Sequence, residues 1–182
     1  MAFNGMFVPP DQDPRSFGKP EGELATYREY LADYRLTLEL KCVDLTPEQL
    51  ATRSVPPSTL SLLGLVRHCA QMEAVWFRNV LGGQPDLPRV YASPGDPDAD
   101  FHGGVGTQEC VDEAFATWKA VIADAEAWVE SQTDADLGKG YLTRHGEPVS
   151  ARDVLVHVIE EYARHCGHAD LLREAIDGRT GQ

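Results

Sequence analysis

Four long stretches of the chain carry apolar residues at the spacing of an α-helix. In the first stretch these residues lie three or four positions apart: Leu24, Tyr27, Leu31, Tyr34 and Leu38. The same spacing predicts helices over about residues 21–43, 61–82, 107–129 and 150–178. Almost no stretch shows the two-residue alternation of a strand. The pattern therefore predicts an all-α fold, a bundle of four long helices.

Capping and helix-breaking residues separate these stretches. Thr46 and Gln49 can form a capping box, which predicts a short helix that ends before Pro56-Pro57. Residues 82–106 hold four prolines and six glycines, so we expect a long inter-helix loop without regular structure of its own. The turn from His145 to Pro148 suggests a small hairpin ahead of the last helix.

The first 20 residues differ from the rest of the chain, because four prolines forbid a continuous helix there. We therefore expect an N-terminal extended arm over 1–20 and a single bundle domain over 21–182. A chain of 182 residues buries a core without disulfide bonds. Its cysteines form no CxxC pair and are expected to be small buried hydrophobes: Cys42, Cys69, Cys110 and Cys166.

Charge and hydropathy narrow the range of partners. Asp and Glu number 29 against 16 Lys and Arg, which gives a formal net charge of −13. Such a charge argues against nucleic acid and against a membrane surface, because both favour basic faces. No apolar run approaches the roughly 20 residues of a membrane span. The N-terminus has no signal-peptide pattern, so we expect the protein to be cytoplasmic.

One line along the last predicted helix carries four residues with metal-binding side chains, namely His157, Glu161, His165 and His168. The line borders the apolar stripe, where a lone carboxylate is expensive to bury. Glu161 and His165 lie one turn apart and can converge on one ion, with His68 of the second helix as the natural third ligand. Two nitrogens and one oxygen leave a coordination position open, as in catalytic zinc sites. An ion pair within the helix and ordinary hydrogen-bonded histidines remain alternatives.

Two segments resemble a known family: LSLLGLVRHCAQMEAVWFRNVLGG and GEPVSARDVLVHVIEEYARHCGHADLLREAIDG are similar to the DinB-like helical bundles, especially the DUF664 branch. The resemblance covers about residues 21–178 and implies a four-helix bundle in up-up-down-down order. It also implies a divalent metal ion held by His68, Glu161 and His165. Most members have a histidine in the place of Glu161. The related mycothiol-dependent maleylpyruvate isomerases have a glutamate there.

The resemblance also implies a function. Characterised relatives are S-transferases or isomerases that use a low-molecular-weight thiol, so we expect mycothiol or a similar thiol and a small-molecule electrophile as partners. Zinc is the expected ion, with nickel or iron as alternatives, and His157 or His168 is expected to orient a ligand or to shuttle a proton. Two other functions stay open. One is a metal-dependent hydrolase, and the other is a non-catalytic dimeric bundle that binds a metal or a small molecule.

Three further residues bear on assembly. Trp76 and Phe77 are neighbours, and two large aromatic side chains are not expected to face one narrow core stripe together. We therefore expect a homodimer, as family bundles often pair. Glu73 falls among apolar positions of the same helix and is expected to support the metal site, to contact a partner, or to stay neutral or water-bonded.

The long segment 82–106 is expected to act mainly as a structural cover and a dimer element. It leaves the second helix far from His68, so His102 is not expected to be a ligand. The mouth of the site is instead expected between the start of the second helix, the 138–148 connection and the adjacent part of the last helix.

Overall fold

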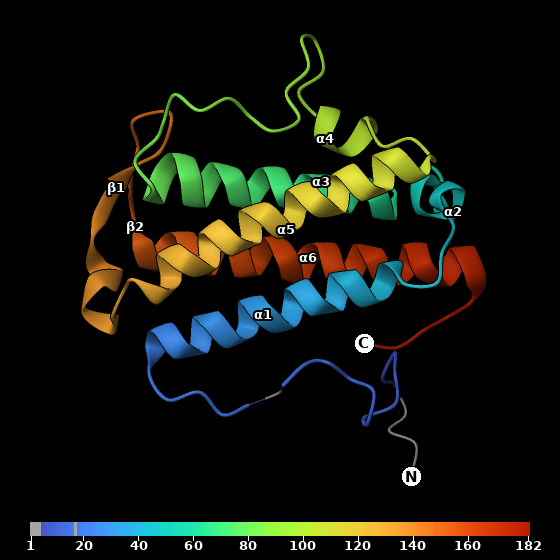
Figure 1. The fold of residues 1–182 in the computed structure, drawn as a ribbon, viewed down its shortest axis with the longest axis horizontal. Helices are drawn as coiled ribbons and strands as arrows, with labels where there is room; N and C mark the ends of the chain where they lie inside the picture. Colours follow the sequence, from blue (N-terminus) through green and yellow to red (C-terminus); the bar gives the residue numbers. More distant parts are fainter. Residues whose placement is uncertain (1–4, 17) are drawn as a thin grey trace.

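Four long helices lie side by side in the computed structural model, which describes residues 5–16 and 18–182 (Figure 1). They are α1 (Glu23–Cys42), α3 (Leu62–Glu73) with its π-helical continuation η1 (Ala74–Leu81), α5 (Gln108–Glu130) and α6 (Ala151–Asp177). Their apolar faces meet in one core, in which Leu65, Trp118 and Tyr162 are almost completely buried. The all-α bundle is thus confirmed. In the described part of the chain, no helix is both long and apolar enough to cross a membrane.

The direction of the helices differs from the expected up-up-down-down order. α1 and α6 run one way and α3 and α5 run the other, which makes the order up-down-down-up (Figure 1). The connections explain the difference. Residues 43–61 stay at one end of the bundle, where α2 (Pro47–Ala51) packs against α3, whereas residues 82–107 lead the chain back along the bundle.

Local capping sets the helix ends as the sequence predicts. The Thr46 hydroxyl accepts a hydrogen bond from the Gln49 amide, and the Gln49 side chain accepts one from the Thr46 amide. Ser150 and Asp153 form the same box at the start of α6. After the short 3₁₀ helix η2 (Asp134–Gly138), strands β1 (Gly140–Leu142) and β2 (Pro148–Ser150) pair antiparallel, so the expected hairpin is present.

The connection between η1 and α5 contains a short helix that the sequence did not predict, α4 (Ala99–His102). It packs against the first turns of α3. A Cβ at Gly64 would lie 2.6 Å from the Phe101 carbonyl oxygen, so a glycine is needed for this close approach. The segment therefore brings regular structure onto α3, beside His68.

A buried polar network joins the four long helices. Arg35 of α1 donates through Nε and Nη2 to the two carboxylate oxygens of Glu73 on α3, at 2.9 and 2.8 Å. Tyr162 of α6 donates to Glu73 at 2.5 Å, and Trp118 of α5 donates to the Tyr162 hydroxyl at 2.8 Å. Glu73 is completely buried and ion-paired within its own chain. It is therefore neither a support of the metal site nor a partner contact.

The neighbouring aromatic residues of η1 both pack within the chain. Phe77 is buried and meets Trp128 edge-on, with ring centroids 6.0 Å apart. Trp76 is half-buried and meets His157 of α6 edge-on at 4.9 Å. Only Phe77 is fully buried in the core, as expected for two neighbouring aromatic residues, and the homodimer stays a prediction.

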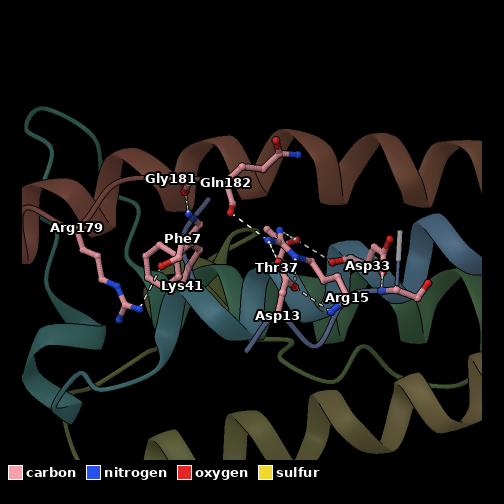
Figure 2. Close-up of polar contacts among 10 residues, drawn as sticks. Phe7, Asp13, Arg15, Asp33, Thr37, Lys41, Arg179, Gly181 and Gln182 are labelled. Carbon is pink, nitrogen blue, oxygen red and sulfur yellow. Dashed lines mark hydrogen bonds and ion pairs between the residues drawn. The ribbon is translucent and has the colours of Figure 1, made fainter. Parts of the chain in front are cut away.

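The N-terminal arm docks against α1 and the end of the chain (Figure 2). Phe7 is buried, and its ring lies 4.2 Å from Lys41 Nζ and 4.0 Å from Arg179 Cζ, within the range of cation–π contacts. The Phe7 amide donates to the Gln182 carbonyl at 2.8 Å, and Arg15 donates to the same oxygen at 3.1 Å. Residues from both ends of the chain thus hold each other on the bundle.

Candidate metal centre

Two helices bring the three predicted ligands together. His68 comes from α3, and Glu161 and His165 lie one turn apart on α6. Glu161 Oε2 lies 3.2 Å from His165 Nε2 and 3.5 Å from His68 Nε2, and one ligand atom of each residue lies within 4.8 Å of the others. Two imidazole nitrogens and one carboxylate oxygen form a donor set that suits zinc and related divalent ions.

Each histidine of this triad has a partner on its second ring nitrogen. His68 Nδ1 donates to Asp100 Oδ2 at 2.8 Å, and His165 Nδ1 lies 3.3 Å from Nδ1 of His168. These contacts leave both Nε2 atoms facing Glu161. Burial by itself would raise the pKa of Asp100, but the hydrogen bond from His68 and the electrostatic interaction with its ring outweigh burial and lower that pKa. Asp100 is therefore an acceptor at neutral pH.

The state of the two histidines fits a metal ion. His68 Nε2 is buried and has no hydrogen-bond partner among the described residues, which is costly for a polar atom. Burial, assisted by the neighbouring His68, lowers the pKa of His165 to about 4, although Glu161 opposes the shift. His165 is therefore neutral at pH 7 and keeps a lone pair. A divalent cation would satisfy both nitrogens and the Glu161 carboxylate at once.

Aromatic rings flank the triad. The Phe101 ring stacks on His68 with centroids 4.1 Å apart and planes inclined by 16°, and it lies 5.8 Å from His165. His157 stands beyond Glu161, with Nε2 3.8 Å from Glu161 Oε1. A quarter of the Glu161 side chain is exposed, so the triad reaches solvent along the side of the bundle.

The long connection contributes more to the site than expected. His102 lies outside the triad and contacts Asp96, with Nδ1 3.3 Å from Oδ2. However, α4 places Asp100 and Phe101 directly on His68. The β1–β2 hairpin, expected at the mouth, lies at the opposite end of the bundle from α4 (Figure 1).

Sequence reasoning missed Asp100 and Phe101. Both lie in the aperiodic segment rich in proline and glycine, where no helical spacing links them to His68. Only the backbone path of α4, which depends on Gly64, brings them to the site.

Comparison with known proteins places this architecture in a family. A crystal structure titled as the conserved protein of a locus from Enterococcus faecalis has the same fold, with a TM-score of 0.65 and 17% identity. That likeness covers 86% of this chain and 98% of the other. No curated protein matches the chain. The model of the mycothiol-S-transferase family matches residues 26–178, a range that holds His68, Glu161 and His165. The chain therefore belongs to the mycothiol-S-transferase family.

Proposed function

We propose that this protein is a divalent-metal-dependent S-transferase that joins mycothiol, or a similar low-molecular-weight thiol, to a small electrophile in the cytoplasm. The observation that carries the proposal is the buried, unpartnered Nε2 of His68, which faces Glu161 and His165. The family match supports the thiol as the co-substrate. His68, Glu161 and His165 would hold the ion, and zinc fits this donor set best.

A divalent ion at the triad would supply a Lewis acid that lowers the pKa of a thiol and favours its nucleophilic thiolate. The side chains around the triad are placed to bind the ion and to accept the proton of the thiol. Glu161 directs Oε2 toward the two ligand histidines and leaves Oε1 beside His157, which is partly exposed. We assign to His157 the acceptance of the thiol proton. The sulfur then bonds to the electrophilic carbon, and a leaving group departs with its electron pair.

The rings around the triad would help the thiolate to react. Phe101 covers one face of His68, and Trp76 packs against His157. Both rings keep water from their side of the cluster, and a lower local dielectric strengthens the interactions of charged groups. Neither ring contributes a ligand atom.

The test is thiol conjugation by the zinc-reconstituted protein. With mycothiol and 1-chloro-2,4-dinitrobenzene we expect enzyme-dependent thioether, detected by mass spectrometry, and about one zinc ion per chain. His165→Ala should remove most of the zinc and the activity. Glu161→Gln should weaken zinc binding without unfolding the bundle, because an amide is a poorer ligand than a carboxylate. His102→Ala is the control and should change neither property.

The other functions would give different results. Consumption of an ester or amide substrate in the absence of thiol would identify a hydrolase. Zinc bound at the triad without turnover of any thiol in a panel would identify a non-catalytic binding protein. Zinc binding that survives His165→Ala would contradict the site itself.

A further inference from the structure

We propose that Asp100 is a positioning residue that fixes the tautomer of His68 and so presents its Nε2 to the metal ion. The inference rests on the metal site of the proposed function. It concerns a residue outside the two ligand-bearing helices, carried by α4 in the long connection between η1 and α5.

The contact between the two side chains is close and shielded from water. Asp100 Oδ2 lies 2.8 Å from His68 Nδ1, and Asp100 is 3% exposed. With little water nearby to replace either partner, the hydrogen bond is stronger than it would be on the surface.

The chemistry of the pair determines the proton position. An ionised carboxylate only accepts hydrogen bonds, so the neutral imidazole of His68 must carry its proton on Nδ1. Its lone pair then lies on Nε2, the buried atom that has no hydrogen-bond partner among the described residues and faces Glu161. Phe101 fixes the plane of the His68 ring by stacking, but stacking does not determine which ring nitrogen carries the proton. The hydrogen bond to Asp100 determines it.

The same segment offers a matched control. Asp96 contacts His102 through the same atoms, Oδ2 and Nδ1, at 3.3 Å. Both of these side chains are 38% exposed, and neither belongs to the triad. Removing Asp96 therefore takes away a comparable carboxylate–histidine contact from the connection without touching the site.

The main experiment measures zinc affinity by competition with a chromophoric chelator. Removing such a partner of a ligand histidine typically weakens metal binding about 10–100-fold, and we expect an increase of that size in the Kd of Asp100→Ala. Asp100→Asn has nearly the same shape, and its amide oxygen still accepts from Nδ1, so a smaller increase is expected. Asp96→Ala should bind zinc as the unmodified protein does.

A second measurement separates positioning from a general structural effect. Nitrogen-15 NMR of the zinc-loaded protein should show the metal on Nε2 of His68 and a slowly exchanging proton on Nδ1. In Asp100→Ala that proton should exchange rapidly, while circular dichroism shows the same helix content. If Asp100→Ala does not fold, Asp100→Leu decides the matter, because leucine has nearly the shape of aspartate but cannot accept a hydrogen bond from Nδ1. An unchanged zinc affinity and a slowly exchanging Nδ1 proton in Asp100→Leu would overturn the inference.

The outcomes distinguish this inference from the proposed metal site. If His165→Ala loses zinc but Asp100→Ala does not, the positioning role is wrong and the metal site stands. An equal loss in Asp96→Ala, or zinc on Nδ1 of His68, also overturns the positioning role. If His165→Ala binds zinc as tightly as the unmodified protein does, both proposals fall together.

Discussion

Buried thiols illustrate how residue environment limits chemistry in this protein. Burial raises the pKa of Cys42 and of Cys166 to about 12, and it raises the pKa of Cys69 well above the ordinary value. At pH 8 a thiol of pKa 12 is ionised in roughly one molecule in 10⁴, so it is a poor nucleophile. Cys110 differs because its side chain is only half-buried. The three buried thiols are therefore not expected to supply the reactive sulfur of the proposed reaction.

This difference predicts selective labelling. Brief treatment of the native protein with iodoacetamide at pH 8 should modify Cys110 alone, and intact-mass measurement should show one adduct. Cys110→Ser should then give none. Rapid addition of several groups to the native protein would contradict the described burial. The unfolded protein, in which all thiols are accessible, provides the control.

The three candidate ligand residues could be placed together from sequence because they lie on two helices with clear helical spacing. Glu161 and His165 are separated by four residues, which places them on one face of any α-helix. The third candidate ligand, His68, lies at the border of the apolar stripe of the second helix, where it can meet them. Asp100 carries no such signal, because its position depends on the course of the connection and not on a helical period.

At the scale of elements, the packing of α4 on α3 depends on Gly64. A methyl group there would lie 2.6 Å from the Phe101 carbonyl oxygen, a backbone atom that moves only if α4 moves. We predict that Gly64→Ala separates α4 from α3, disrupts the bond between Asp100 and His68, and raises the Kd for zinc. The chelator competition described above measures this change.

Gly167→Ala is the matched control for that variant. Gly167 lies on α6, and a Cβ there would meet nothing within 4 Å. Alanine in an open helical position should stabilise the protein by about 0.5–1 kcal/mol, measured by urea unfolding. Unchanged zinc affinity in Gly64→Ala would show that α4 does not support the site.

The network around Glu73 predicts a large effect on stability. Glu73→Leu should leave the buried Arg35 with only the exposed Glu126 carboxylate, 3.6 Å away, and lower the free energy of unfolding by about 3–5 kcal/mol. The double variant Arg35→Met with Glu73→Leu should recover most of this loss, because no unpaired charge remains. Urea unfolding of the single and double variants checks both expectations. A loss below about 1 kcal/mol in the single variant would contradict the described pairing.

The helices themselves follow from local chemistry, whereas their directions do not. Ser150 with Asp153 and Thr46 with Gln49 cap helices through residues three positions apart, so sequence predicts these starts. The spacing of apolar residues, however, gives no information on the direction in which a helix runs through the bundle. The up-down-down-up order depends on which end of the bundle each connection occupies. The π-helical form of η1 and the short α4 were not predicted either. The spacing of apolar residues does not separate a π-helix from an α-helix, and α4 lies in a segment without helical spacing.

At the scale of the whole molecule, we propose that two chains pair. The proposal rests on the resemblance to bundles that often pair and on Trp76, which is only half-buried beside the buried Phe77. Light scattering at micromolar protein concentration should give twice the mass of one chain. A single species with the mass of one chain would contradict the dimer.

The docking of the N-terminal arm has a consequence for synthesis on the ribosome. Phe7 is synthesised early, but its ring packs near Arg173 and Arg179. Arg173 is added to the chain 166 residues after Phe7. At about 5–20 residues per second, the arm waits roughly 8–33 s for this part of its binding site. During that interval α1 can form, but Lys41 and Phe7 have not yet met the end of α6. Attachment of the arm is therefore a late step of folding, which follows the packing of α1 against α6.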